Sequence, residues 1–356
     1  MQGKAVGNIS SKMEKKMPCY GPITAYRLTF ERTKNNASVI VFSKSQVNGK
    51  PYIEMQMACG QCIGCRIDIS RQWAIRCLHE AQTHGINNNY FLTLTYDDEH
   101  LNPTGTLVKR DLQNFMKEVR RQKKGARAVE DKKNNKIRYP IRFFQCGEYG
   151  EACKYCGQTR KQCYCKKYTA GLGRPHHHVC LFNIHFSDLT LQEEKEDNKF
   201  YTSTLLGNIW KKGYHVITDL NFSTAAYTAR YCCKKVTGKK QTEHYKRCDH
   251  RSGRIEYVEP EYLTMSRRPG IGRLWYDKYR TDLFPKDFIT DQGKTFKVPK
   301  YYNKLYEETY PHKFEEIKRE RRKRAYANKS ERTLDRLEAK RKVKQSQLSQ
   351  LKRDQV

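Results

Sequence analysis

Three consecutive histidines, His176, His177 and His178, lead directly into the apolar segment VCLFN. Because alternate residues of a strand point to the same face, His176 and His178 would share one face of an extended segment and His177 would take the other. Two imidazoles side by side can chelate a divalent cation. Glu148, in the sequence CGEYGE, could add a carboxylate if its segment pairs with the histidine segment as a hairpin. An exposed strand end is the alternative interpretation.

A pair of tyrosines provides a second set of reactive groups. In the segment STAAYTARYCCKKV, a helical projection places Tyr227, Arg230, Tyr231 and Lys234 on one side and small apolar residues on the other. Tyrosines at i and i+4 lie one above the other on a helix, so both hydroxyls could reach one place in turn. A phenol becomes a useful nucleophile when cations lie beside it and a metal ion polarises the electrophile. Packing is the alternative role for such a pair.

The chain contains 14 cysteines, and their spacing favours metal sites over disulfides. The sequence CKYCGQTRKQCYC holds four of them at CxxC and CxC spacing, namely Cys153, Cys156, Cys163 and Cys165. A complete set of four thiolates on a short loop is typical of a closed structural zinc site.

A second cysteine group supplies only three ligands. Cys59, Cys62 and Cys65 follow CxxCxxC spacing in the sequence CGQCIGCR, which indicates a second zinc site if a fourth ligand comes from elsewhere. The candidates for this fourth ligand are Cys19, Cys77 and His79.

The net charge identifies the class of partner. Seventy lysines and arginines against 38 acidic residues give a formal charge of +32, which favours a polyanionic partner. No apolar run approaches 18 residues, and the first residues lack the apolar core of a signal peptide, so neither a membrane span nor secretion is indicated. We therefore expect a cytoplasmic protein with one main domain and additions to it.

The hydrophobic pattern predicts the elements that must position these groups. Helices are expected at residues 66–84, 108–122, 203–212 and 223–236, and strands at residues 90–96, 141–146, 176–184 and 214–220. Ser223 or Thr224 is the expected cap of the tyrosine helix. This order predicts an α+β fold in which a central antiparallel or mixed β-sheet has its helices on one face. Tyr96 and Asp97, at the end of the first strand, are further candidates for lining the site.

Three segments together resemble a known family. FLTLTYDDEHL, CGEYG…GRPHHHVCLF and AAYTARYCCKKVTG are similar to the three motifs of HUH superfamily rolling-circle replication initiators. More narrowly, MPCYGPITAYR, LVKRDLQNFMK, EYLTMSRRPGIGRLWYDKY and DLFPKDF resemble the replication initiation proteins of the gokushovirus branch of the Microviridae. The resemblance covers about residues 17–306. It departs from the family pattern at His177, where a hydrophobic residue is usual, and at the added cysteine-rich segment.

The resemblance implies an HUH endonuclease fold with zinc-binding additions and a metal-dependent nickase and strand transferase. One tyrosine would attack the origin DNA, leaving a 5′-phosphotyrosine and a free 3′-OH, and the second would resolve the product into a circle. The implied divalent ion is Mg²⁺ or Mn²⁺, held by His176, His178 and Glu148, with Arg230 and Lys234 stabilising phosphate charge. The implied partners are single-stranded DNA, the replication origin and host helicase and polymerase, all in the host bacterial cytoplasm.

The expected domain organisation follows from these assignments. Residues 1–58 form an N-terminal segment whose first 16 residues are disordered, and a basic helical or disordered tail ends the chain. The remaining expected parts are an endonuclease core at 59–240, a zinc insertion within it at about 151–170, a C-terminal extension of the core at 241–312 and the tail at 313–356.

Two other functions share some of these features. A zinc-containing DNA-binding regulator without catalysis would explain the charge and the cysteines, but it leaves the histidine and tyrosine pairs without a role. An HUH transposase or plasmid relaxase would share the chemistry and differ in its product.

Overall fold

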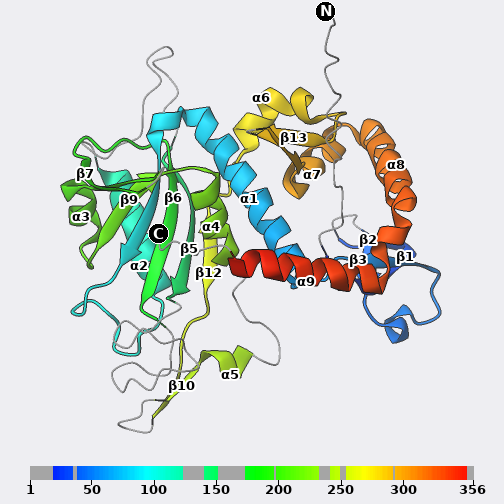
Figure 1. Ribbon diagram of the computed structural model, residues 1–356, viewed down its shortest axis with the longest axis horizontal. Coiled ribbons are helices and arrows are strands. Elements are labelled where there is room, and N and C mark those ends of the chain that lie inside the picture. The colour runs from blue at the N-terminus through cyan, green and yellow to red at the C-terminus, as the bar shows by residue number, and fades with distance from the viewer. Residues whose placement is uncertain are drawn as a thin grey trace, which may run out of the picture. The chain divides into compact units, whose positions relative to one another are not determined.

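The computed structural model describes most of the chain (Figure 1). The described residues are 19–34, 38–122, 140–150, 173–195, 198–231, 241–248, 254–291 and 293–350, excluding the side chains of Ile86, Tyr231, Arg247 and Cys248. The chain divides into two compact units. Unit 1 consists of Met1–Asp68, Leu283–Val298 and Tyr306–Val356, and unit 2 consists of Ile69–Asp282 and Pro299–Leu305.

Unit 2 is built on a seven-stranded sheet in which each strand pairs antiparallel with its neighbours, in the order β12-β5-β6-β4-β9-β8-β7. The strands are β4 (Asn89–Thr95), β5 (Arg142–Tyr149), β6 (Pro175–Phe182), β7 (Thr190–Lys195), β8 (Asn198–Thr202), β9 (His215–Asp219) and β12 (Tyr262–Met265). The predicted α+β class with a central antiparallel sheet is confirmed.

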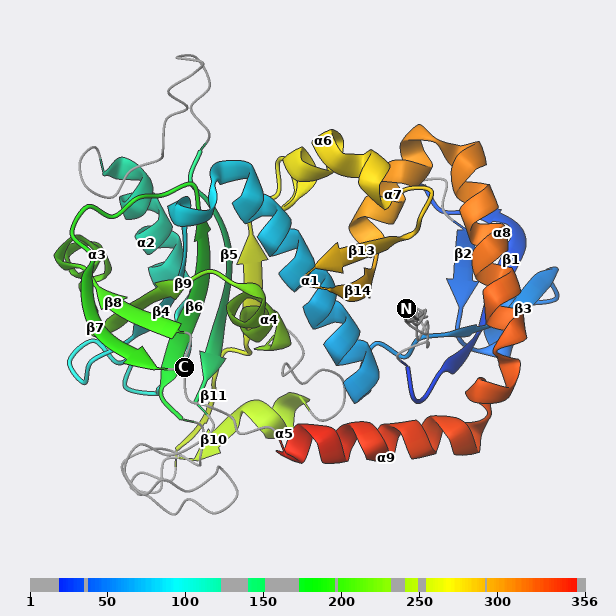
Figure 2. The same ribbon diagram turned by 45° about the horizontal axis from the view of Figure 1, so that its top comes forward.

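Helices cover both faces of this sheet (Figure 2). On one face, α2 (Lys109–Arg121) and α3 (Thr204–Trp210) share a core with alternate residues of β4, β6 and β9. On the other face, α1 (Ile63–His84) and α4 (Phe222–Tyr231) pack against the intervening strand residues through alanines and Cys77. The expectation that the helices lie on one face was therefore wrong, because the central strands are apolar on both sides and each side needs a cover.

Local sequence explains why α2 packs as it does. Its apolar residues recur at helical spacing, and all four members of the predicted stripe are buried, namely Leu112, Phe115, Met116 and Val119. The stripe faces Leu92 and Leu94 of β4 within one apolar core. The remaining elements of unit 2 are η2 (Ile86–Asn88), α5 (Gln241–Tyr245), β10 (Lys246–Cys248), β11 (Ile255–Tyr257), most of α6 (Arg273–Leu283) and the first part of α7 (Lys300–Thr309).

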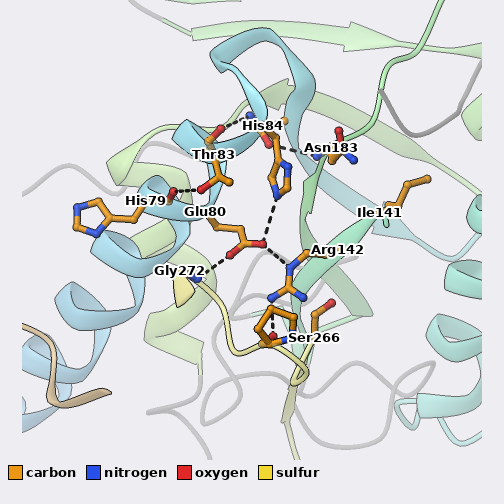
Figure 3. A network of polar contacts seen from close by, with 12 residues as sticks. His79, Glu80, Thr83, His84, Ile141, Arg142, Asn183, Ser266 and Gly272 are labelled. Carbon is orange, nitrogen blue, oxygen red and sulfur yellow. Dashed lines mark hydrogen bonds and ion pairs between the residues drawn. The ribbon is translucent and has the colours of Figure 1, made fainter. Parts of the chain in front are cut away.

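A buried ion pair fastens α1 to the sheet (Figure 3). The guanidinium of Arg142, in β5, donates to the carboxylate of Glu80, in α1, and both side chains are almost fully buried. The second oxygen of Glu80 accepts the backbone N–H of Gly272 at 2.6 Å, and Arg142 also donates to the carbonyl of Pro269 at 2.7 Å. His84 contacts the same carboxylate at 3.4 Å. The sequence SRRPGIG thus closes a network around one buried carboxylate.

Unit 1 contains a second, smaller sheet in the order β2-β1-β3, formed by β1 (Ile23–Arg32), β2 (Ser38–Val41) and β3 (Tyr52–Met57). Its other elements are η1 (Lys44–Val47), the hairpin of β13 (Phe288–Asp291) and β14 (Lys294–Lys297), α8 (Pro311–Ala327), η5 (Lys329–Arg332) and α9 (Leu334–Gln350). Phe314 of α8 is buried beside Phe284 and Tyr306. Within the described residues, no helix has both the length and the apolar composition needed to cross a bilayer.

Candidate active site

Glu148, His176 and His178 come together on one face of the central sheet. β5 and β6 pair antiparallel with Glu148 directly opposite His176. Glu148 Oε1 lies 2.6 Å from His176 Nε2 and 2.9 Å from His178 Nε2. Their candidate ligand atoms all lie within 4.8 Å of one another. The hairpin pairing and the strand alternation expected from the sequence therefore produce a group that could hold a metal ion.

Hydrogen bonds to the far nitrogens orient both imidazoles. His176 Nδ1 lies 3.0 Å from the carbonyl oxygen of Arg174, and His178 Nδ1 lies 3.1 Å from Thr93 Oγ1. Since a carbonyl oxygen only accepts, His176 Nδ1 carries a proton, and in the neutral ring Nε2 then presents a lone pair toward Glu148. Such a second contact behind each ligand is the usual arrangement in metal sites.

The carboxylate of Glu148 is also suited to a cation. Burial alone would raise its pKa, but the hydrogen bonds from His176 and His178 outweigh burial and hold the pKa of Glu148 below its ordinary value. Its Oε2 atom is buried and has no hydrogen-bond partner among the described residues. An ionised carboxylate with an unsatisfied oxygen beside two imidazole nitrogens is a donor set that borderline and hard divalent ions accept.

Tyr227 lies next to this group. Its ring stands edge-on to the His178 ring, with the centroids 4.9 Å apart, and the guanidinium carbon of Arg230 lies 5.5 Å from the centroid of the Tyr227 ring. Ser70 Oγ of α1 donates to the carbonyl of Ala226 at 2.7 Å, which fixes α4 at the height of Tyr227. The side chain of Tyr231 and the whole of Lys234 lie outside the described residues.

The N-terminus of α4 differs from the expected one. Asn221 Oδ1 accepts the backbone N–H of Thr224 at 2.9 Å, and Thr224 Oγ1 accepts the backbone N–H of Asn221 at 3.0 Å. This reciprocal pair makes Asn221 the cap, with Thr224 as its partner three residues later. The expectation of Ser223 or Thr224 as the cap was wrong because the helix begins earlier, at Phe222.

His177 lies on the opposite face, fully buried in a chain of hydroxyl groups. Its Nε2 lies 2.9 Å from Tyr96 Oη, which donates to Asp111 Oδ2 at 3.0 Å, and its Nδ1 lies 3.3 Å from Tyr262 Oη. Burial lowers the pKa of His177 to about 3, so the ring is neutral and can donate through one nitrogen and accept through the other. This network explains how a polar residue replaces the hydrophobic one that is usual at this position.

The same alternation places Tyr96 with His177 and not with the metal ligands. Its side chain packs with Trp210 on the α2 and α3 face. The expectation that Tyr96 lines the site was therefore wrong. Asp97 accepts the backbone N–H of His100 at 2.8 Å in the turn after β4.

Gly147 is required by the ring of Tyr262. The two residues are paired across β5 and β12, and Gly147 is also paired with His177 of β6. A Cβ at Gly147 would lie 2.6 Å from the Tyr262 ring, closer than packing allows. The glycine in CGEYG therefore lets Tyr262 cross β5 and reach His177.

A separate group of four cysteines lies in unit 1. Cys59, Cys62 and Cys65 are joined by Cys19, and the four sulfur atoms lie within 4.8 Å of one another. Of the three candidates for the fourth position, Cys77 packs in the α1 core and His79 stacks on Trp275, both in unit 2. The first cysteine group, Cys153, Cys156, Cys163 and Cys165, lies outside the described residues.

The comparisons with known proteins agree with the motifs. Residues 89–236, which include the strands and the helix described above, match the family model for the phage replication-associated protein ORF2. The replication-associated protein ORF2 of Spiroplasma virus 4 is 29% identical over 84% of this chain and 83% of its own length. The replication-associated protein VP4 of Bdellovibrio phage phiMH2K is 28% identical over 84% of this chain and 80% of its own length. No solved structure matches the chain.

The resemblance to phage replication proteins that the sequence motifs indicate is thereby confirmed: over most of its length, this chain is a relative of phage replication-associated proteins.

Proposed function

We propose that this protein is an HUH-type rolling-circle replication initiator that nicks its phage origin and later circularises the product. The observation that carries the proposal is the position of Tyr227 beside the group formed by Glu148, His176 and His178, on one face of one sheet. A general DNA-binding regulator has no need for a nucleophile beside a group that could hold a metal ion. The relationship to phage replication-associated proteins supports the biological setting, in the host bacterial cytoplasm.

The three ligands would hold Mg²⁺ or Mn²⁺, which as a Lewis acid would polarise an oxygen of the scissile phosphate. Two imidazoles and one carboxylate fit Mn²⁺ at least as well as Mg²⁺, since Mg²⁺ prefers oxygen ligands alone. The protein positions the lone pairs through the carbonyl of Arg174 and the hydroxyl of Thr93.

The chemical step assigned to the tyrosines is a phosphoryl transfer. The hydroxyl oxygen of one tyrosine forms a bond to phosphorus and loses its proton, while the bond to the 3′ oxygen breaks and that oxygen takes up a proton. The products are a 5′-phosphotyrosine and a 3′-OH that primes synthesis. Arg230, close to the Tyr227 ring, and Lys234 are assigned to stabilise the charge on the phosphate.

The second tyrosine completes the cycle. Tyr231 follows Tyr227 by one helical turn, so its hydroxyl can attack the regenerated origin while the first adduct is still in place. The 3′-OH released by that cut then displaces the first tyrosine and closes a circle of single-stranded DNA.

The test is a substitution series on a labelled origin oligonucleotide. Tyr227→Phe and Tyr231→Phe are each expected to allow one cleavage and a covalent adduct but to impair strand transfer, and the double variant is expected to form no adduct. Tyr214→Phe, at an exposed tyrosine, is the matched control and should behave as wild type. An adduct is detected by denaturing gel migration and mapped by mass spectrometry.

The alternatives predict other results. A regulator binds the oligonucleotide and forms no adduct with any variant. A transposase or relaxase forms the adduct but does not yield circular phage DNA. If one single change removes all adduct and the other has no effect, the alternation of two tyrosines is wrong.

A further inference from the structure

The four sulfur atoms of unit 1 have the spacing of a mononuclear metal site. Cys19 Sγ lies 3.6 Å from Cys59 Sγ and 4.0 Å from Cys62 Sγ, and Cys65 completes the group. A tetrahedral zinc ion with Zn–S bonds of about 2.3 Å holds its sulfur atoms about 3.8 Å apart. A disulfide would need about 2.05 Å between two of the sulfurs. All four cysteines have free thiols.

The surrounding backbone favours thiolates at this place. The backbone N–H of Tyr20 points to Cys62 Sγ at 3.3 Å, that of Cys59 to Cys19 Sγ at 3.2 Å, and that of Cys62 to Cys59 Sγ at 3.3 Å. Gly60 adopts φ +74°, which a side chain would disfavour, and so allows the tight turn between Cys59 and Cys62. N–H donors directed at sulfur stabilise its negative charge.

The group also lies where the small sheet needs support. β1 and β3 pair from Ile23 opposite Met57, so Cys19 and Cys59 lie just beyond the same end of that ladder. β2 and β3 contain no buried residue, and β1 contains only Ala25 and Leu28. A sheet with so little core usually depends on a disulfide or a metal.

We propose that Cys19, Cys59, Cys62 and Cys65 bind one structural zinc ion that holds the β1–β3 sheet together at its open end. The site closes the chain between Cys19 and Cys59, a stretch that contains the whole sheet. It is separate from the proposed nicking site, which uses residues of unit 2 only, and it requires no part in that chemistry.

The first test uses thiol protection in the unaltered full-length protein. Cys59 and Cys62 are partly exposed, so without a metal they should react readily with iodoacetamide. With zinc bound, mass spectrometry should find Cys19, Cys59, Cys62 and Cys65 unlabelled until a strong chelator is added, and labelled after it. Labelling of Cys59 and Cys62 in the untreated, native protein would overturn the proposal.

The second test measures zinc and local stability. Cys19→Ser should lower the zinc content by one equivalent, whereas Cys77→Ala, at a buried cysteine outside the group, should not change it. Carrying out both in a background with Cys153→Ser and Cys163→Ser removes any contribution of the other cysteine segment. Hydrogen exchange of Ile23–Met57 should accelerate after chelation, while that of β4 and β6 should not. Iron in place of zinc, or unchanged zinc in Cys19→Ser, would contradict the assignment.

Discussion

Each histidine of the triplet has a different set of neighbours, although the three are adjacent in the chain. His176 and His178 direct their Nε2 atoms to Glu148, while His177 joins Tyr96 and Tyr262 on the reverse side of the sheet. The residue type is the same, and the strand geometry decides what each ring can do.

A substitution series should separate these roles. His178→Ala is expected to abolish metal-dependent nicking and adduct formation and to leave binding of single-stranded DNA largely intact, because it removes a ligand from the proposed metal site. His177→Ala should retain metal-dependent nicking but lose about 1–3 kcal/mol of stability, because it leaves buried hydroxyls without a partner.

Nicking rates at several Mn²⁺ concentrations and urea unfolding of each variant provide the two readouts. Equal loss of nicking from both changes, at equal folded fraction, would show that strand alternation does not assign the ligands.

At the level of single residues, the sequence predicts most of the candidate metal group. Alternation in β6 and the guess of a hairpin were sufficient to select Glu148 with His176 and His178. The sequence does not reveal Thr93 or Tyr262 as partners, because their contacts arise from pairing between strands that are distant in the chain. The choice of Cys19 over Cys77 and His79 depended on the same kind of long-range contact.

The elements of unit 2 are held in place by polar contacts as well as apolar packing. α1 carries Glu80 into contact with Arg142 of β5 and with the loop before α6. Because the same sheet presents Glu148, a shift of β5 relative to its neighbours would alter the candidate active site. The buried pair therefore contributes to the positioning of β5.

Removal of Glu80 should be strongly destabilising. Glu80→Ala leaves the buried guanidinium of Arg142 without its carboxylate, and we expect a loss of about 3–5 kcal/mol in the free energy of unfolding. Asp277→Ala, which breaks the exposed pair with Arg273 on α6, is the matched control, with an expected loss of about 1 kcal/mol or less. Urea denaturation followed by circular dichroism measures both. Similar losses in the two variants would mean that the buried network is unimportant.

The central elements follow from local pattern, and the peripheral ones do not. β4, β6 and β9 occur within a residue or two of their expected bounds because apolar β-branched and aromatic residues alternate or cluster there. β7 is fully exposed and rich in charge, so its sequence gives no strand signal, and it forms by pairing with β8. β12 was also missed, since a four-residue edge strand depends on β5 for its conformation.

At the scale of the whole molecule, two buried histidines make stability depend on pH. Burial lowers the pKa of His79 and that of His177 to about 3 in the folded protein. Each side chain has a pKa of about 6.5 in the unfolded chain, so below pH 6.5 the unfolded state binds protons that the folded state does not. Stability is therefore lost as the pH falls from about 6.5 toward 3, and above this window the two histidines have no effect.

We expect each of these histidines to reduce stability by about 1.4 kcal/mol at pH 5.5 relative to pH 7.5. His79→Gln retains a polar side chain without a titrating ring, so its loss between these pH values should be smaller than that of wild type by about this amount. Urea unfolding at both pH values tests the difference. An equal loss in the two proteins would show that His79 is not neutral when folded.

The pairing of β6 with β4 and β5 also restricts how this segment can change in length. One residue inserted between His176 and His178 would send the two imidazoles to opposite sides of the sheet, because side chains alternate with a period of two. An insertion of two residues would keep both rings on one side but move one of them away from Glu148. Relatives that share this site should therefore differ in this strand by substitution, and accommodate insertions and deletions in the connections beyond its ends.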